Sequence, residues 1–307
     1  MTYVLLIFLD GIGLGDDDPD VNPFAVAHTP TLHTLAGGRK WLRSTPYTDT
    51  GRALFIPTDP RLGVPGRPQS ATGQAAILTG RNVSAEIGEH YGPRPNPAVR
   101  AILNEDNVFT RVVRAGGTAA LIDAYPPGFH RAIARGKRLP SSIQQAVLAA
   151  GLRLFTEDDV YAGTAMSSDW TGEGWRNYLG YTDTPLYSRA EAGVRLAELA
   201  RQHDFSMFSH WFTDEVGHRG PFGRGVEVLE LFDGVMASLL DAWDDSAGLI
   251  VLTSDHGKME DLSSRHHTEN DVPTVVIGQA RHVFADGLRD LTGITPGVLR
   301  VLNGNHQ

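Results

Sequence analysis

The stretch GLIVLTSDHGKMED, residues 248–261, decides the fold class because an unbroken apolar run gives way to an acid and an imidazole. The apolar part, residues 249–253, is typical of a strand buried on both faces of a sheet. Asp255 and His256 close this strand. In open parallel sheets, ligands bind outside the carboxyl ends of the strands. The stretch therefore predicts a buried parallel strand that delivers two chemically active side chains to a ligand site.

Further strands and helices alternate along the chain. Strands are expected at 3–9, 118–124, 205–212 and 271–278. Helices are expected at 107–115, where Gly116 and Gly117 follow, and from Ser188, which forms a capping box with Glu191, to Gln202. One apolar helical face is formed by Val228, Phe232, Val235, Leu239 and Trp243. This alternation predicts an α/β fold with a mainly parallel sheet and helices on both faces.

The pattern loosens between residues 125 and 187, which are rich in Pro, Gly, aromatic and charged residues. We expect this segment to form a small inserted cap with one clear helix near 141–150, while residues 1–124 and 188–307 form the core. Trp170 and Trp175 are either pocket-lining residues or buried anchors. The basic cluster HRAIARGKR, residues 130–138, is expected to be a solvated face, with contact to a second anionic group of a substrate as the alternative.

The composition excludes several classes of partner and site. The chain has 307 residues, a formal net charge of -9 and no cysteine. The charge argues against capture of nucleic acid or of an anionic membrane. No apolar stretch reaches the roughly 20 residues of a membrane span, and the N-terminus lacks signal-peptide features, so a cytoplasmic location is expected. Any metal must be held by carboxylates and imidazoles.

Three carboxylates and several imidazoles are candidate metal ligands. Asp10, Asp214 and Asp255 each lie at or just past the end of an expected strand and should converge in one crevice. Each alone would be an ordinary turn former, but together they repel and need positive charge nearby. The accompanying histidines are His218, His256 and the pair His266 and His267. Mixed oxygen and nitrogen ligands suit Mn²⁺, Zn²⁺ or Fe²⁺.

A nucleophile is offered by the loop and helix GVPGRPQSATGQAAILTGR, residues 63–81. Ser70 stands at the start of a short helix that is expected to run to Thr79. A helix N-terminus carries partial positive charge, which favours a phosphoryl group there. On the residues alone, Ser70 could instead be an N-cap, and Thr72 is a rival nucleophile.

Several blocks resemble the alkaline phosphatase superfamily and, within it, the branch of cofactor-independent phosphoglycerate mutases and phosphopentomutases. The blocks are QSATGQAAILTGR (69–81), DEVGHRG (214–220), SDHGKME (254–260), HTENDVP (267–273), LDGIGLG (9–15), NPFAVAHTPTL (22–32) and ITPGVLRVL (294–302). The resemblance covers residues 1–85 and 205–302. It implies an alkaline phosphatase-like core with two divalent ions, Mn²⁺ or Zn²⁺.

The resemblance also implies a role for each candidate residue. Asp214, His218 and His267 would hold one ion, and Asp10, Asp255 and His256 the other. His267 is preferred over His266 because it precedes Thr268 in the HT block. Ser70 would bridge to the metals as an alkoxide and accept the phosphoryl group.

These parts predict a metal-dependent phosphohydrolase that acts on phosphomonoesters or phosphodiesters of a small metabolite through a phosphoserine. One alternative is a phosphomutase, although the larger insertion of the phosphoglycerate mutases is not found here. Another is a metal-binding domain without catalysis. A sulfatase is disfavoured because Ala-Thr-Gly follows Ser70 and the chain lacks cysteine.

Overall fold

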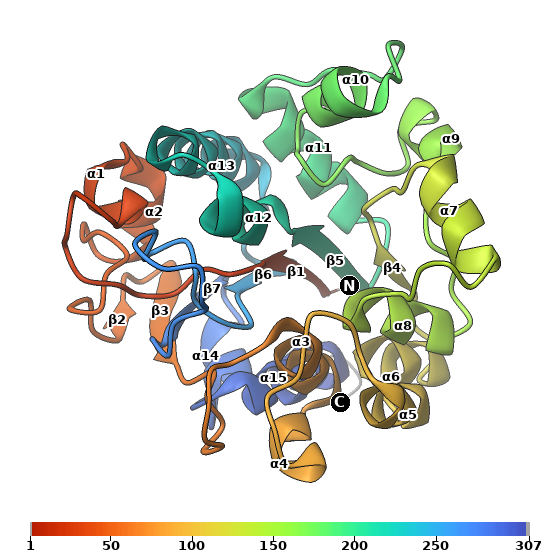
Figure 1. Cartoon of the computed structure of the whole chain (residues 1–307), viewed down its shortest axis with the longest axis horizontal. Helices are drawn as coiled ribbons and strands as arrows, with labels where there is room; N and C mark the ends of the chain where they lie inside the picture. The colour runs from red at the N-terminus through yellow and green to blue at the C-terminus, as the bar shows by residue number, and fades with distance from the viewer. Residues whose placement is uncertain (1, 305–307) are drawn as a thin grey trace.

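A seven-stranded sheet runs through the part of the chain that the computed structural model describes, residues 2–304 (Figure 1). The strand order is β2-β3-β7-β6-β1-β5-β4. The strands are β1 (Tyr3–Leu9), β2 (Thr48–Asp49), β3 (Ala53–Thr58), β4 (Ala119–Leu121), β5 (Phe205–His210), β6 (Gly248–Thr253) and β7 (Val272–Ile277).

The sheet is parallel in its centre and antiparallel toward one edge. Strands β6, β1, β5 and β4 run in the same direction, whereas β7 is antiparallel to both β6 and β3, and β2 is antiparallel to β3. In register, Leu9 faces His210 on β5 and Phe8 faces Thr253 on β6. The predicted α/β class with a mainly parallel sheet is confirmed.

Helices fill the connections between the strands. The N-terminal ones are α1 (Pro23–Val26), α2 (Pro30–Leu35), α3 (Ser70–Thr79), α4 (Val83–Ile87), α5 (Pro97–Glu105) and α6 (Val108–Arg114). Between β4 and β5 come α7 (Pro127–Ala134), α8 (Ser142–Ala149), α9 (Glu157–Tyr161), α10 (Glu173–Leu179) and α11 (Arg189–Ala200). The rest are α12 (Phe212–Arg219), α13 (Phe222–Ala242), α14 (Arg281–Ala285), the 3-10 turn η1 (Leu291–Gly293) and α15 (Ile294–Asn303). None of the helices within residues 2–304 is long and apolar enough to span a membrane.

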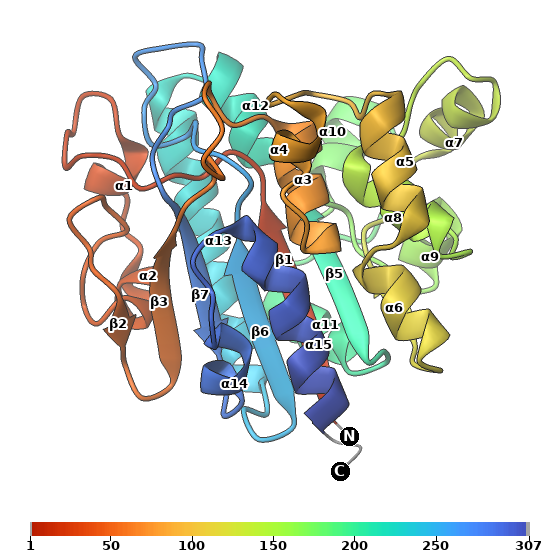
Figure 2. The same cartoon turned by 90° about the horizontal axis from the view of Figure 1, so that it is seen from below.

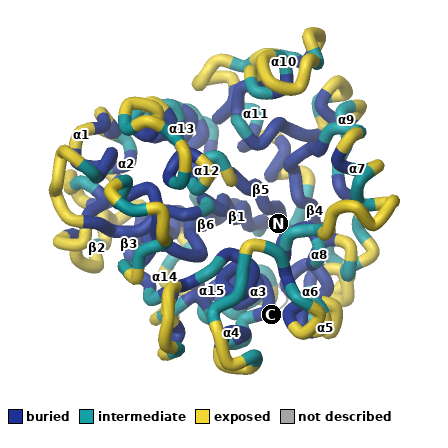
Figure 3. Tube along the Cα trace, in the orientation of Figure 1, coloured by how far each residue is buried: buried dark blue, intermediate teal, exposed yellow. Residues whose placement is uncertain are grey.

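Two hydrophobic cores lie on opposite faces of the sheet. Figure 2 shows α15 in front of the sheet and α11 and α13 behind it, and Figure 3 shows the central strands buried between these layers. Alternate side chains of β1 enter each core: Leu5 and Ile7 pack toward α11 and α13, whereas Leu6 and Phe8 pack toward α3 and α15. Successive side chains of a strand point to opposite faces, so a strand covered on both faces must be apolar throughout. This explains the unbroken apolar sequence of β1.

The helices predicted outside residues 125–187 lie close to their expected bounds. The capping box of Ser188 and Glu191 opens α11, and the predicted apolar face of α13 is buried. Strand β4 is shorter than the expected 118–124.

Four helices, α7 to α10, occupy the region 125–187, which was expected to hold one. This region also packs into both main cores, through Trp170 on one face and Phe129 on the other. That residues 125–187 form a cap separate from the core remains a prediction.

Candidate metal centre

The three central strands deliver polar residues to one edge of the sheet. Asp10 follows β1, Asp255 and His256 follow β6, and β5 lies on the other side of β1. The backbone N–H of Asp10 donates to the His210 carbonyl at 3.0 Å, which fixes the end of β1 against the end of β5. Because neighbouring parallel strands end at the same edge, residues more than 200 positions apart meet there.

Asp214 and His218 reach this edge on helix α12. The sequence predicts strand through residue 212, but β5 ends at His210, and α12 begins at Phe212. Asp214 and His218 are therefore one helical turn apart on the same face, with Oδ1 and Nε2 separated by 3.3 Å. Helix α12 lies so close to the β1 end that a Cβ on Gly11, which has a φ of +70°, would come within 2.8 Å of Asp214 Oδ1. Only glycine fits there.

The first potential ligand group combines Asp214, His218 and His267. His267 Nε2 lies 3.0 Å from His218 Nε2 and 3.6 Å from Asp214 Oδ1. On its other side, His267 Nδ1 lies 2.9 Å from the Pro68 carbonyl. A carbonyl only accepts, so Nδ1 carries the proton and the lone pair of Nε2 faces the group. This is the tautomer that a metal ligand needs.

The second potential ligand group combines Asp10, Asp214 and His256. His256 Nε2 lies 3.5 Å from Asp10 Oδ1, and the ring stacks on His267 with centroids 3.7 Å apart. Asp214 thus belongs to both groups. The two groups are adjacent and share one carboxylate.

Asp255 lies behind this second group and is fully buried. Its carboxylate is 3.6 Å from His256 Nε2 and accepts a hydrogen bond from Gln74 Nε2 at 3.3 Å. All six side chains predicted to bind metal therefore gather at one place, while Asp255 is the member that also has an amide partner. The neighbouring His266 is exposed, and its side chain contributes to neither group.

The electrostatics of the cluster fit a bound cation. Asp10 Oδ1 and Asp214 Oδ1 are buried and accept no hydrogen bond within the described residues. Burial, and then the neighbouring Asp255, raises the pKa of Asp10 well above its ordinary value. Burial, and then Asp214, raises the pKa of Asp255 to about 7. Crowded carboxylates with unpaired oxygens fit a site for divalent ions, which would supply the missing positive charge.

Two imidazoles of the cluster, those of His256 and His267, are held neutral. Burial lowers the pKa of His267 to about 4, with His256 as the next cause, and burial likewise lowers the pKa of His256. A neutral imidazole keeps a free lone pair, and nitrogen with oxygen donors suits first-row divalent metals. The donor set therefore fits the predicted Mn²⁺ or Zn²⁺.

Ser70 faces the cluster, whereas Thr72 faces away from it. Ser70 is the first residue of α3, Gln69 is the N-cap, and Ser70 Oγ lies 3.0 Å from His256 Nε2. The N-cap alternative for Ser70 is thus wrong. The Thr72 hydroxyl accepts from the Tyr91 N–H at 3.1 Å, so it serves to fix the backbone. Of the two hydroxyls, only that of Ser70 contacts the ligand cluster.

Glu260 is a site residue to which the sequence reasoning gave no role, although it lies in the SDHGKME block. It is buried and accepts hydrogen bonds from the N–H groups of Gly13 and Lys258, at 3.0 and 2.8 Å, and from Asn270 Nδ2 at 3.0 Å. Glu260 therefore ties together the loops that follow β1 and β6 and precede β7. The two tryptophans left open by the sequence, Trp170 and Trp175, are both buried, so they are anchors.

Comparisons with known proteins indicate what this chain is similar to. Residues 179–303 match the family model described as Metalloenzyme superfamily. The 2,3-bisphosphoglycerate-independent phosphoglycerate mutase of Methylobacillus flagellatus is 28% identical over 131 residues, which are 40% of this chain and 25% of that protein. The corresponding enzyme of Chromobacterium violaceum is 35% identical over 97 residues, 29% of this chain and 18% of that protein. The matched part thus spans about a quarter or less of these relatives.

Solved structures share the fold at low sequence identity. A protein from Pyrococcus horikoshii aligns with a TM-score of 0.57 and 16% identity over 98% of this chain and 97% of that chain. The phosphoglycerate mutase of Leishmania mexicana aligns with a TM-score of 0.51 and 12% identity over 98% and 95%. The resemblance inferred from the sequence blocks is confirmed. The chain is thus similar to the Metalloenzyme superfamily model over residues 179–303 and to phosphoglycerate mutases over part of their length.

Proposed function

We propose that the chain is a metal-dependent phosphohydrolase that cleaves phosphomonoesters or phosphodiesters of a small metabolite through a phosphoserine on Ser70. The observation that carries this proposal is the position of Ser70 Oγ, 3.0 Å from His256 Nε2 and at the N-terminus of a ten-residue helix. A hydroxyl placed between a cluster of potential metal ligands and the positive end of a helix is suited to attack an anionic phosphorus centre.

Two divalent ions would be held by the residues already described. Asp214, His218 and His267 would hold one, and Asp10, Asp255 and His256 the other, with Ser70 adjoining both. When bound, such ions lower the pKa of the attacking hydroxyl and neutralise charge on the phosphoryl oxygens. The shared position of Asp214 in both ligand groups supports two sites close together.

The residues of the chain account for the remaining steps. The Ser70 hydroxyl lies beside the His256 nitrogen that would bind an ion, and the first turn of α3 favours the negative phosphoryl group. Ser70 Oγ forms a bond to phosphorus while the bond to the ester oxygen breaks, and the departing alcohol takes up a proton. Attack by water on the phosphoserine then releases phosphate and restores the serine hydroxyl.

A phosphomutase is the second candidate, and the printed names of the sequence relatives favour it. In that reaction the phosphoserine returns its phosphoryl group to a different oxygen of the substrate. The match covers only about a quarter or less of these relatives, so most of their length has no counterpart in it. Hydrolysis needs only the site described above and water, which is why we place it first.

The test uses purified protein with Mn²⁺ or Zn²⁺ and p-nitrophenyl phosphate. We expect metal-dependent release of p-nitrophenol, and a loss of at least about a thousandfold in kcat for Ser70→Ala, as for other nucleophile deletions. Thr72→Ser keeps the Thr72 hydroxyl and is the matched control. Retained turnover in Ser70→Ala would contradict the assigned nucleophile, and no turnover with any metal would favour a non-catalytic metal-binding domain.

A second assay separates hydrolysis from phosphoryl transfer within one molecule. The protein is incubated with a sugar phosphate, and both free phosphate and the isomeric sugar phosphate are measured. Free phosphate as the main product supports the hydrolase, whereas isomerisation without release of phosphate supports the mutase.

A further inference from the structure

Two arginines, Arg94 and Arg138, have no acidic partner within the described residues. Arg94 is half-buried in the loop between α4 and α5, and Arg138 is exposed in the turn that follows α7. Within residues 2–304, neither guanidinium lies at ion-pair distance from a carboxylate or donates a hydrogen bond to another residue. The chain carries a net charge of -9, so two unpaired cations close together are unusual for it.

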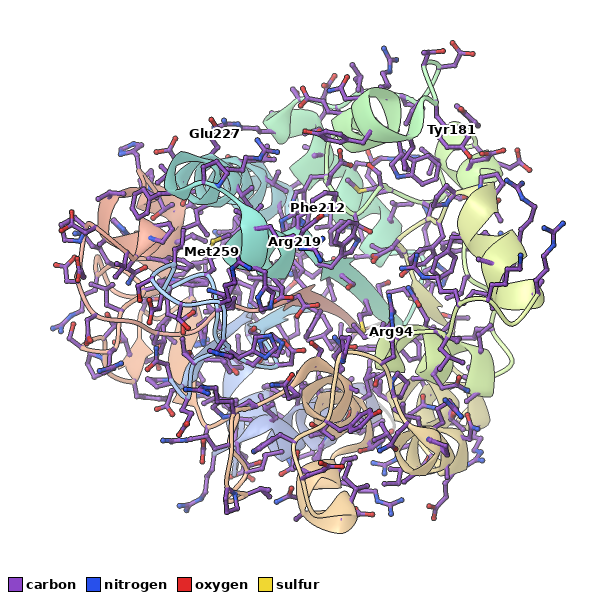
Figure 4. All side chains as sticks on the ribbon, in the orientation of Figure 1. Arg94, Tyr181, Phe212, Arg219, Glu227 and Met259 are labelled. Atoms are coloured by element: carbon purple, nitrogen blue, oxygen red, sulfur yellow. The ribbon has the colours of Figure 1, made fainter. Side chains whose placement is uncertain are left out.

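The loop that carries Arg94 is fixed against the start of α3. Thr72 and Tyr91 exchange two hydrogen bonds, from Thr72 N to the Tyr91 carbonyl and from Tyr91 N to Thr72 Oγ1, both at 3.1 Å. A Cβ on Gly92 would lie 3.2 Å from the Ser70 backbone N. Arg94 follows two residues later, and Figure 4 shows it near the centre of the molecule, between α3 and α8. It is thus held close to the candidate nucleophile.

Arg138 approaches from the region between β4 and β5. Its guanidinium carbon lies 4.9 Å from the centre of the Phe129 ring, a cation-π contact. Phe129 stacks on Tyr125 with centroids 4.5 Å apart, and Tyr125 lies four residues beyond the carboxyl end of β4. The segment that follows Arg138 lies against the first turn of α3, because Ser142 Oγ at the start of α8 donates to the Ala71 carbonyl at 2.8 Å.

The two guanidinium groups and the cluster lie close enough to influence one another. Burial lowers the pKa of Arg94, the positive charge of Arg138 lowers it further, and Tyr125 and Asp10 act in the opposite direction. Arg94 therefore lies within electrostatic range of both Arg138 and Asp10. Holding the half-buried guanidinium of Arg94 near a second positive charge is unfavourable unless an anion joins them.

We propose that Arg94 and Arg138 form a subsite for a second anionic group of the substrate, a carboxylate or phosphate that is not transferred. This inference rests on the proposed function, because the transferred phosphoryl group must face Ser70 and the ligand cluster. Arg138 sits over the Phe129 ring and the loop of Arg94 adjoins the start of α3, so an anion shared by both arginines lies beside the group that faces Ser70. The substrate is then a phosphorylated metabolite with at least two anionic groups.

The test measures binding without turnover, in the Ser70→Ala protein loaded with Mn²⁺. Three probes with a three-carbon skeleton are titrated by calorimetry: glycerol 3-phosphate, 3-phosphoglycerate and glycerol 1,3-bisphosphate. We expect at least one of the two probes that carry two anionic groups to bind about tenfold or more tightly than glycerol 3-phosphate, which carries one. The gain comes from charge-assisted hydrogen bonds to the second group. Tighter binding of 3-phosphoglycerate identifies the second group as a carboxylate. Tighter binding of glycerol 1,3-bisphosphate identifies it as a phosphate.

Arginine variants in the same background locate the subsite. Arg138→Ala and Arg94→Gln should each reduce the preference for the doubly anionic probe by about tenfold. Lys137→Ala removes the same charge from the exposed neighbour of Arg138 and should leave the preference unchanged. Circular dichroism verifies folding, and Mn²⁺ titration verifies metal loading. Because Arg138 is exposed, its replacement tests the subsite even if the replacement of half-buried Arg94 disturbs the local fold.

Equal affinity for all three probes, or a preference that survives Arg138→Ala, would overturn the subsite. An equal loss in Lys137→Ala would also overturn it, because the effect would then come from general surface charge. Since no turnover is needed, failure of hydrolysis in the wild-type protein would refute the proposed function without deciding the binding result.

Discussion

Carboxylates in two regions of this chain have opposite surroundings. In the region between β4 and β5, Asp159 accepts two hydrogen bonds of 2.6 Å from the Arg153 guanidinium and one of 2.8 Å from the Thr156 N–H. At the carboxyl edge of the sheet, Asp10 and Asp214 each keep a buried oxygen that accepts no hydrogen bond within residues 2–304. Buried acids are normally paired, so the first kind serves the fold and the second is arranged for a ligand.

The largest expected effect is on metal affinity at the edge of the sheet. Asp214→Asn replaces a carboxylate that belongs to both ligand groups. We expect the affinity for Mn²⁺ to fall by at least about a hundredfold, more than the loss typical of residues that only support ligands. Calorimetric titration measures the change. Glu215→Gln alters an exposed acid on the same helix and is the control; a similar loss in both variants would contradict a specific role for Asp214.

In the region between β4 and β5, the same exchange of acid for amide should reduce stability. Asp159→Asn removes the ion pair with Arg153, whose hydrogen bonds hold the pKa of Asp159 well below its usual range. Because Arg153 is largely exposed, solvent screens the pair, and we expect a loss of about 2 kcal/mol in the free energy of unfolding. Urea unfolding provides the measurement.

The control for this variant is Asp158→Asn, which changes an exposed neighbour. Affinity for Mn²⁺ should be the same in both variants and in the wild type. A drop in metal affinity for Asp159→Asn would show that the two regions are not separable in function.

The pH dependence should also separate the two regions. Burial and Asp214 raise the pKa of Asp255 to about 7. Below that pH the carboxyl group is protonated, and metal binding must displace the proton. Affinity for Mn²⁺ should therefore rise as the pH increases and level off above about 7, by up to tenfold per pH unit for one released proton. Titration at several pH values measures it, and a flat profile in wild type would contradict the raised pKa.

The same shift predicts the stability of the protein in chelator. The folded-state pKa of Asp255 lies above the unfolded value, so the folded state binds more protons between about pH 4 and 7. The contribution of this group to stability is therefore present at low pH and is lost as the pH rises through about 7. Asp255→Asn should remove this dependence.

The smallest effect concerns Asp10 in the absence of metal. Its pKa is raised by burial and by Asp255, so its charge is unfavourable when no cation is bound. Asp10→Asn should raise the free energy of unfolding in chelator at neutral pH by about 1 kcal/mol, because a neutral amide costs less to bury. This sign is opposite to that for Asp159→Asn. A destabilised Asp10→Asn protein would contradict the contrast between the regions.

How far the sequence predicts this molecule depends on which force acts at each residue. The strand at 248–253 and the face of α13 follow from periodic burial, which a single sequence displays directly. The direction of β7 does not, because an apolar strand looks alike in parallel and antiparallel pairing. The place of Asp214 on a helix was missed since the aromatic pair Trp211 and Phe212 prolongs the strand-like pattern of β5.

Some residues of the candidate site could likewise be predicted from the sequence, and others could not. Ser70, Asp255 and His256 could be named because they stand at the ends of regular elements and within recognisable blocks. The position of Arg94 depends on a loop that packs against α3 through Tyr91 and Gly92, and such contacts leave no periodic trace in the sequence. Long-range packing between irregular segments is thus the part that the sequence alone did not reveal.

The most direct test of this account is a crystal structure of the protein grown with Mn²⁺, with ions located by anomalous scattering. The account predicts two adjacent ions, one contacting Asp214, His218 and His267 and the other contacting Asp10, Asp255 and His256, with Ser70 Oγ turned toward them. Density without an anomalous peak among these side chains, at a Mn²⁺ concentration that saturates the protein in solution, would contradict it.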